Sequence, residues 1–183
     1  MRAAMAEAER ARGGTGDNPW VGSVIVWGGA IVARGHTQGP GEDHAEIGAL
    51  AEARRSGIDL SAATLYSTLE PCSFHGRTPA CAKVIGESGV RTLVTGIRDP
   101  NPRVDGAGAE IVRAAGVPVI EDVCAAEIRR QLGSWIFRYH PHEPLRRARG
   151  MLPLDRGELA RALAEAYGVE AALADDIARR ALG

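Results

Sequence analysis

The chain has 183 residues, of which 45% are hydrophobic and 25% charged, a composition typical of a globular protein large enough to bury a hydrophobic core. Its 22 basic and 23 acidic residues nearly cancel, which argues against the broad basic surface of a nucleic-acid-binding protein. Residues 1–14 lack the apolar core of a signal peptide, and no apolar run reaches about 18 residues, so we expect a cytoplasmic protein without a membrane span.

Turn signals and hydrophobic periodicity divide residues 1–139 into alternating strands and helices. The strands are predicted at 21–27, 30–35, 64–68, 91–97 and 117–120, and the helices at 1–12, 43–55, 80–88, 108–115 and 121–139. The turn Gly28-Gly29 joins the first two strands as an antiparallel hairpin, whereas helical connections favour parallel pairing of the later strands. The sequence therefore predicts a layered α/β domain with a mixed sheet.

Composition changes near residue 140. Residues 140–153 are rich in proline and arginine and are predicted to form a linker, and Leu and Ala recur at helical spacing over 154–168 and 169–182. We therefore predict one domain over 1–139, the linker over 140–153 and a helical tail over 154–183. The tail would pack on the domain or on a second subunit, and we expect a homodimer or larger homo-oligomer.

There are three potential metal ligands: His44 and Cys81 lie in the predicted first turns of two helices, and Cys72 lies in the loop before the second of these helices. One imidazole and two thiolates suit Zn²⁺, and three protein ligands leave the fourth tetrahedral position open to water, as catalytic zinc sites do. The positive end of a helix dipole stabilises a thiolate, and Thr78-Pro79 is a good start for the helix that holds Cys81. Zinc would lower the pKa of water towards about 7.

Glu46 follows His44 by two residues, so its carboxylate would approach the zinc-activated water without binding the metal. A carboxylate in that place can move protons between water and substrate. An alternative is that Asp43 and Glu46 form a capping box, in which Glu46 only bonds the backbone at the start of the helix.

A His-x-Glu sequence followed by Pro-Cys and a second Cys resembles the signature of the cytidine-deaminase-like zinc deaminases. The eight residues between Cys72 and Cys81, together with the segments 18–26 and 99–108, resemble one branch, the pyrimidine deaminase of riboflavin biosynthesis. The resemblance covers about residues 1–138. It implies a three-layer α/β/α sandwich around a five-stranded mixed sheet, and the hydrolytic release of ammonia from a phosphoribosylaminopyrimidine.

The resemblance also implies roles for other side chains. Asn18 would bind the pyrimidine, His36 would lie near the substrate, and Arg77 would contact the ribose phosphate, for which a guanidinium is well shaped. The alternatives are a turn residue before Pro19 for Asn18 and a solvated surface charge for Arg77.

Two departures from the branch leave the substrate open. A histidine that touches the substrate usually stands where this chain has Phe74, and a phenyl ring can stack on a heterocycle but cannot hydrogen-bond its polar edge; His75, the next residue, would compensate after a small loop shift. Many members also continue into a reductase domain, for which this chain has no room. The other candidate functions are deamination of another nucleoside, base, specialised-metabolite heterocycle or tRNA adenosine, and a non-catalytic, zinc-stabilised partner subunit.

Overall fold

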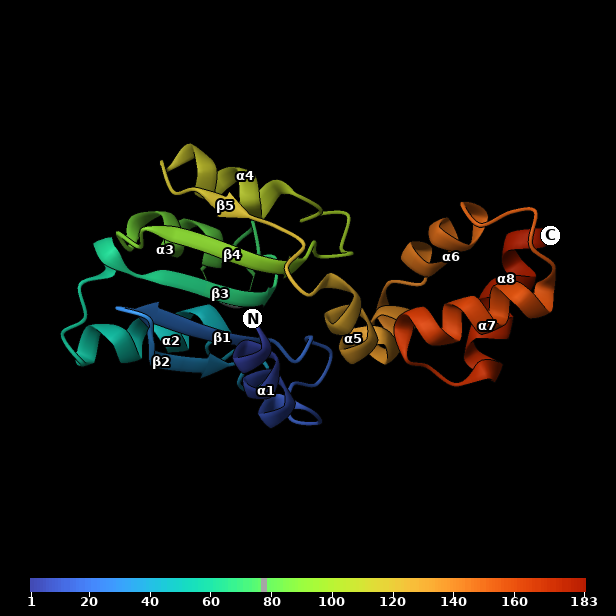
Figure 1. Ribbon diagram of the computed structural model, residues 1–183, viewed down its shortest axis with the longest axis horizontal. Helices are drawn as coiled ribbons and strands as arrows, with labels where there is room; N and C mark the ends of the chain where they lie inside the picture. The colour runs from blue at the N-terminus through green and yellow to red at the C-terminus, as the bar shows by residue number, and fades with distance from the viewer. Residues whose placement is uncertain (77–78) are drawn as a thin grey trace. The chain divides into compact units, whose positions relative to one another are not determined.

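The computed structural model describes residues 1–76 and 79–183. The chain divides into two compact units, Met1–Ala125 and Ala126–Gly183. The first unit contains a five-stranded sheet in the order β2-β1-β3-β4-β5 (Figure 1). Its strands are β1 (Gly22–Trp27), β2 (Ala30–His36), β3 (Thr64–Leu69), β4 (Thr92–Ile97) and β5 (Val119–Ile120). Its helices are α1 (Arg2–Ala11), α2 (Ala45–Arg55), α3 (Cys81–Glu87) and α4 (Ala107–Ala114), with a 3₁₀ turn at Leu60–Ala62.

The sheet is mixed, as predicted. Strand β1 pairs antiparallel with both β2 and β3, whereas β3, β4 and β5 run parallel. The hairpin turn uses Gly28 and Gly29 with φ of 57° and 81°, and such positive values at both positions suit a tight hairpin. The hairpin therefore forms from local sequence, while the parallel pairs need α3 and α4 as crossovers.

Helices cover both faces of the sheet. A Cβ atom at Gly22 would lie 1.9 Å from the carbonyl oxygen of Ala4 in α1, and one at Gly35 would lie 2.1 Å from that of Ala45 in α2. Glycine at these two positions lets each helix approach the sheet closely. Gly35 is paired with Ser23, the neighbour of Gly22 in β1, so the two glycines mark opposite faces of the sheet. The predicted three-layer α/β/α sandwich is thus confirmed.

The main core lies on the α2 side of the sheet. Ile25, Leu50, Leu65, Ile85 and Leu93, from three strands and from α2 and α3, are all at most 1% exposed and form one hydrophobic cluster. At about 25 cal/mol for each Å² of buried apolar surface, residues of this size each contribute roughly 1.5–3 kcal/mol. This core fixes the N-terminal ends of α2 and α3 on one side of the sheet.

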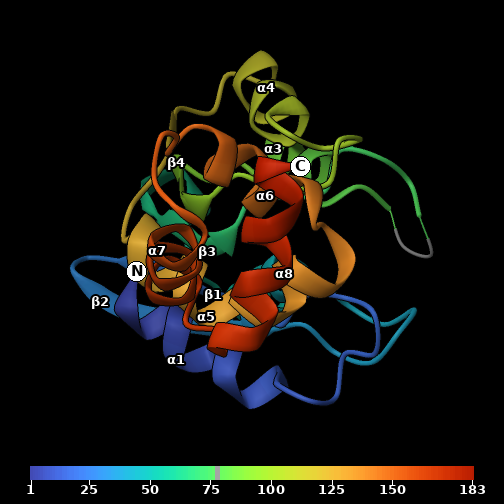
Figure 2. The same ribbon diagram turned by 90° about the vertical axis from the view of Figure 1, so that its right-hand side faces the viewer.

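The second unit is helical and consists of α5 (Ala125–Tyr139), α6 (His142–Arg149), α7 (Arg156–Tyr167) and α8 (Ala171–Leu182). Helices α7 and α8 pack against each other (Figure 2). Asp155 and Glu158 form a capping box at the start of α7, and Gly168 ends it with φ of 59°. The two predicted C-terminal helices are therefore present.

The structure differs from the prediction in residues 121–153. Asp122 and Cys124 have φ of 64° and 62°, values outside the helical region, so α5 begins at Ala125. Helix α5 belongs to the helical unit, because Gly133 lets it approach the backbone of Tyr167 in α7. The predicted linker contains α6, whose early Pro144 is tolerated because the first backbone N–H groups of a helix have no intrahelical partner. Within the described residues, no helix is both long and apolar enough to cross a membrane.

Candidate active site

Two helix starts and one loop bring the three predicted metal ligands together. His44 is the N-cap residue of α2, Cys81 is the first residue of α3, and Cys72 lies in the loop after β3. The Nδ1 atom of His44 lies 3.8 Å from Sγ of Cys72 and 3.3 Å from Sγ of Cys81. All three ligand atoms lie within 4.8 Å of one another.

This donor set fits a zinc ion. Tetrahedral ligands at ordinary Zn–S and Zn–N bond lengths are about 3.6 Å apart, and the two observed N–S distances, 3.8 and 3.3 Å, bracket that value. The backbone N–H of Cys81 also donates to Sγ of Cys72 at 3.2 Å, a contact that favours a thiolate. Helix α3 begins at Cys81, one residue after the predicted start at residue 80, with Ala80 as an N-cap that makes no side-chain bond. Thr78 lies outside the described residues.

The two thiols differ sharply in acidity. The hydrogen bond from the Cys81 side chain lowers the pKa of Cys72, and the bond with His44 adds to this effect. The same contact and burial raise the pKa of Cys81. Two adjacent thiols in a buried site thus tend to keep one proton between them, and a divalent cation that requires both as thiolates would displace it.

Glu46 is only 3% exposed and lies in the first turn of α2. Its Oε1 atom accepts a hydrogen bond from the hydroxyl of Ser67 at 3.2 Å. Burial is the main cause that raises the pKa of this carboxyl group. The alternative of a capping box with Asp43 is wrong, because the N-cap residue is His44 and it makes no side-chain capping bond. Glu46 is therefore available for chemistry.

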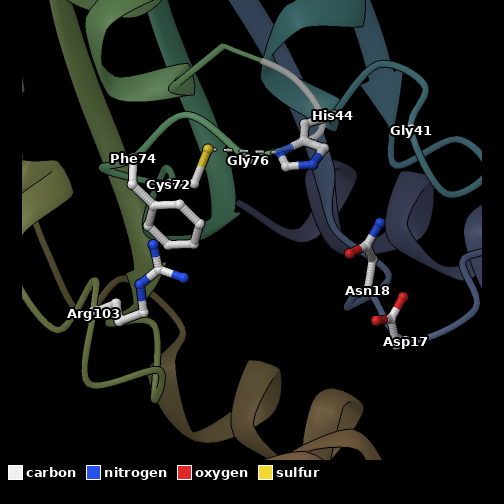
Figure 3. A pocket seen from close by; sticks show the side chains of 8 residues that line it. All are labelled: Asp17, Asn18, Gly41, His44, Cys72, Phe74, Gly76 and Arg103. Atoms are coloured by element: carbon white, nitrogen blue, oxygen red, sulfur yellow. Dashed lines mark hydrogen bonds between the residues drawn. The ribbon is translucent and has the colours of Figure 1, made fainter.

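The site opens into a cavity of about 400 Å³. Figure 3 shows Phe74 and Arg103 together on one side of this cavity, and Asn18 and Asp17 on the other. The cavity is lined by Asp17, Asn18, Gly41, His44, Cys72, Phe74, Gly76 and Arg103. Its volume falls within the range of small-molecule sites.

The predicted substrate-binding residues are only partly brought together. Asn18 and Phe74 line the cavity beside the metal ligands, whereas His75 is exposed and not among the lining residues. Arg77 lies outside the described residues. His36 lines a different cavity, where its Nδ1 atom lies 3.7 Å from Oε2 of Glu7 in α1.

The placement of His36 follows from strand alternation. Arg34 and His36 are two residues apart in β2, so their side chains share a face of the sheet. Both contact Glu7 on α1. The structure thus does not bring His36 to the cavity that holds the metal ligands.

Arg103 is a cavity residue that the sequence interpretation missed. Its guanidinium carbon lies 3.9 Å from the centroid of the Phe74 ring. The loop around it is fixed, since the Arg103 N–H donates to Oδ1 of Asn101 at 3.0 Å and the Ser73 hydroxyl donates to the Arg103 carbonyl at 3.0 Å. The only sequence signal was its place in the Asp-Pro-Asn-Pro segment, which does not reveal that this loop folds against Phe74.

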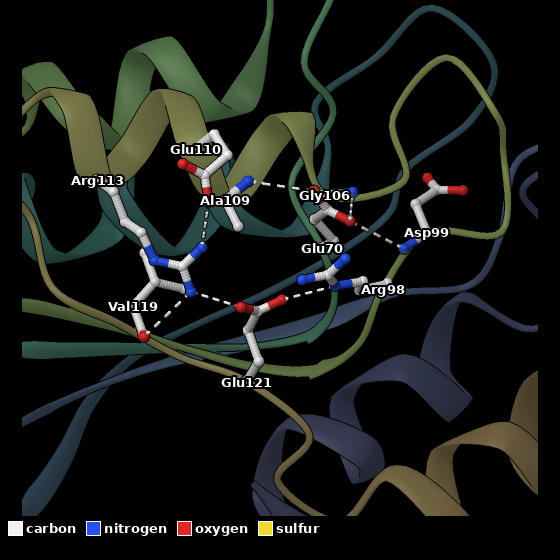
Figure 4. Close-up of polar contacts among 9 residues, drawn as sticks. All are labelled: Glu70, Arg98, Asp99, Gly106, Ala109, Glu110, Arg113, Val119 and Glu121. Carbon is white, nitrogen blue, oxygen red and sulfur yellow. Dashed lines mark hydrogen bonds and ion pairs between the residues drawn. The ribbon is translucent and has the colours of Figure 1, made fainter.

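Glu70 is a second missed residue, and it connects the cysteine loop to the loop of Arg103. Its side chain is 3% exposed. Oε2 accepts from the N–H groups of Asp99 at 3.2 Å and Gly106 at 2.9 Å, and Oε1 accepts from that of Ala109 at 3.1 Å (Figure 4). One buried carboxylate therefore holds the loop after β4 and the start of α4, two residues from the ligand Cys72.

Comparison with known proteins identifies the family. Residues 1–97 match the family model described as the cytidine and deoxycytidylate deaminase zinc-binding region. The chain belongs to this family. His44, Cys72 and Cys81 can accordingly form the zinc site of a deaminase.

The deaminase is similar to part of larger riboflavin biosynthesis proteins. It is 46% identical over 127 residues to the RibD protein of Actinobacillus pleuropneumoniae, which covers 69% of this chain and 33% of the relative. It is 40% identical over 169 residues to RibD of Synechocystis, which covers 92% of this chain and 45% of the relative. The chain thus spans less than half the length of these relatives.

A solved structure also matches this chain over only part of its own length. The Thermotoga maritima diaminohydroxyphosphoribosylaminopyrimidine deaminase/5-amino-6-(5-phosphoribosylamino)uracil reductase aligns with a TM-score of 0.71 and 41% identity. The alignment covers 78% of this chain and 40% of that protein. The family resemblance and the fold expected from the sequence are both confirmed.

Replacing Cys81 with serine is expected to remove most of the bound zinc, because a serine hydroxyl does not supply the thiolate that zinc prefers. Elemental analysis of the purified protein measures the zinc content directly. Cys124→Ser is the matched control, since Cys124 is partly exposed and outside the ligand cluster. Full zinc occupancy in the Cys81→Ser variant would show that Cys81 is not a ligand.

Proposed function

We propose that this deaminase catalyses the hydrolytic release of ammonia from the phosphoribosylaminopyrimidine of riboflavin biosynthesis. The observation that carries the proposal is a three-ligand metal set, two members of which, His44 and Cys72, line a cavity of about 400 Å³, with the buried Glu46 two residues after His44. Three ligands rather than four are typical of a catalytic zinc site. The similarity to the Thermotoga protein, whose name includes this deaminase activity, supports the choice of substrate.

Glu46 would move the protons of the reaction. A zinc ion bound by the ligand set supplies the Lewis acidity that makes water nucleophilic at neutral pH. Glu46 would accept one proton from the attacking water and transfer it to a ring nitrogen, and would then take the second proton, from the hydroxyl group now on the ring carbon, and deliver it to the departing amine. The ring carbon loses its bond to nitrogen and gains a carbonyl oxygen, so one water is consumed and one ammonia is released.

The environment of Glu46 suits this role. Ser67 donates to Oε1 at 3.2 Å, which helps to orient the carboxylate. Burial raises the pKa of the carboxyl group, and a proton carrier works best when its pKa lies close to the working pH. Asn18 lines the cavity, and its amide offers both a donor and an acceptor to the polar edge of a pyrimidine.

An ammonia-release screen tests the proposal. Zinc-loaded protein is assayed with the phosphoribosylaminopyrimidine, cytidine, deoxycytidylate, adenosine and free bases. We expect kcat/KM to be highest for the phosphoribosylaminopyrimidine. A nucleoside or base with the higher kcat/KM would identify a different deaminase, and the absence of ammonia from every compound would favour the non-catalytic partner subunit.

The homo-oligomeric state and the cytoplasmic location remain predictions from the sequence. Light scattering after gel filtration measures the mass of the particle. A mass of 19.3 kDa, that of one chain, would contradict the expected oligomer.

A further inference from the structure

The stacked pair of Phe74 and Arg103 places a positive charge in the wall of the cavity. The guanidinium carbon lies 3.9 Å from the ring centroid, well within the distance at which a cation is attracted to an aromatic face. Both residues line the cavity that contains His44 and Cys72. Figure 3 shows the guanidinium beside the Phe74 ring, next to the open space of the cavity.

Stacking leaves the hydrogen-bonding capacity of Arg103 unused. The five N–H groups of a guanidinium lie in its plane, so a ring packed on its face does not block them. Among the described residues, no carboxylate forms an ion pair with Arg103, whereas Arg34, Arg98 and Arg113 of the same unit are each paired with a glutamate. The in-plane donors are therefore free to bind an anion that enters the cavity.

The backbone of Arg103 is tied to the loop that carries the ligand Cys72. Phe74 follows the ligand Cys72 by two residues. The backbone of Arg103 is tied to the same loop by Ser73 and to its own loop by Asn101. An anion bound by Arg103 would therefore lie beside the loop that carries Cys72, where it can contribute to the positioning of the substrate.

We propose that Arg103, positioned by the ring of Phe74, determines specificity by binding the phosphate monoester of the substrate. A guanidinium presents pairs of N–H groups that match two phosphate oxygens. Phe74 is a positioning residue, since its ring holds the guanidinium. This inference rests on the proposed function for the identity of the substrate, but the anion subsite is testable without turnover.

The decisive measurement is discrimination between two substrates that differ only in the phosphate. The phosphoribosylaminopyrimidine and its phosphatase-treated, ribosyl form are assayed with wild type and with Arg103→Gln. Loss of charge-assisted hydrogen bonds is expected to lower kcat/KM about 10- to 100-fold for the phosphorylated compound, chiefly through KM. The same variant is expected to lose much less kcat/KM on the ribosyl compound, so the ratio of the two kcat/KM values should fall.

Phe74→Leu tests the positioning role, because leucine fills space but offers no aromatic face. It is expected to reduce phosphate discrimination in the wild-type background and to have no further effect on it in the R103Q background. Arg91→Gln is the matched control, an exposed arginine outside the cavity lining, and it should retain full discrimination. Equal effects of Phe74→Leu in both backgrounds would overturn the positioning role.

Failure of this inference can be told apart from failure of the proposed function. If wild type deaminates the phosphorylated compound but Arg103→Gln leaves discrimination unchanged, or lowers activity equally on both compounds, the inference is wrong and the function stands. If wild type releases no ammonia from either compound, the function fails. In that case, calorimetric binding of ribose 5-phosphate tests the anion subsite alone. Binding by wild type that is lost in Arg103→Gln supports the subsite. No binding by wild type, or equal binding by both proteins, overturns it.

Discussion

Replacing Glu46 with glutamine is expected to lower ammonia release by about 10²- to 10⁴-fold, the usual contribution of a positioned acid–base group. Glutamine has nearly the same shape, and its amide oxygen can still accept the Ser67 hydroxyl, which lies 3.2 Å from Oε1 of Glu46. It cannot carry a proton between water and substrate. Zinc content should stay at the wild-type level, because Glu46 is not one of the three ligands.

Activity and zinc content must be measured on the same preparation to separate the two roles. Glu87→Gln is the matched control, since Glu87 is an exposed glutamate at the end of α3 whose ion pair with Lys83 spans 3.9 Å. That variant should match wild type in both measurements. A Glu46→Gln variant that retains more than about a tenth of the wild-type turnover would rule out Glu46 as the proton carrier. Loss of zinc from the same variant would assign it a structural role instead.

The α/β fold was predictable because most of its signals are local. The turn Gly28-Gly29 sets the hairpin, and the period of the apolar residues distinguishes strands from helices over short windows. Helix α6 was missed because prolines and arginines resemble a linker. Pro144 is compatible with a helix only because it falls in the first turn, and that start is set by packing of the helical unit rather than by local sequence.

The cluster of His44, Cys72 and Cys81 was predictable for a different reason. Only a few residue types bind zinc, and their spacing in sequence, with Pro71 directly before Cys72, narrows the possibilities further. His36 shows that residue type alone does not predict where a side chain lies in the fold. Its residue type suits a site near substrate, but the side chain points to the face of β2 that α1 covers, towards Glu7.

Arg103 illustrates a second limit. Nothing in the sequence near residue 103 requires contact with Phe74, since the two loops follow different strands and are 29 residues apart. The contact arises because parallel neighbours β3 and β4 end at the same edge of the sheet, where loops meet. A charged residue inside a loop is thus assigned to a site only when the strand order is known.

Replacing Glu70 with glutamine is expected to lower the free energy of unfolding by about 2–4 kcal/mol, the scale for losing charge-assisted bonds to buried donors. The carboxylate accepts three backbone N–H groups, from Asp99, Gly106 and Ala109. An amide has only one oxygen, so its NH₂ group would face at least one of these N–H donors. Urea unfolding followed by circular dichroism measures the change.

The matched control for this variant is Glu110→Gln on the same helix α4. Glu110 is 72% exposed and forms an ion pair with Arg113, and exposed ion pairs contribute at most about 1 kcal/mol. A Glu70→Gln variant no less stable than Glu110→Gln would show that the three N–H groups find other partners at little cost.

The same substitution is expected to weaken phosphate binding at the substrate site, because Glu70 holds the loop that contains Arg103. Asp99 and Gly106 flank Arg103 in sequence, and both lose a charged acceptor when Glu70 is replaced. The guanidinium would then be held less firmly, so phosphate discrimination should fall even under conditions where the variant is folded. Zinc content should change little, because the three ligands make no bond to the Glu70 carboxylate. A folded Glu70→Gln variant with full phosphate discrimination would show that Phe74 and the local bonds of Ser73 and Asn101 suffice to hold Arg103.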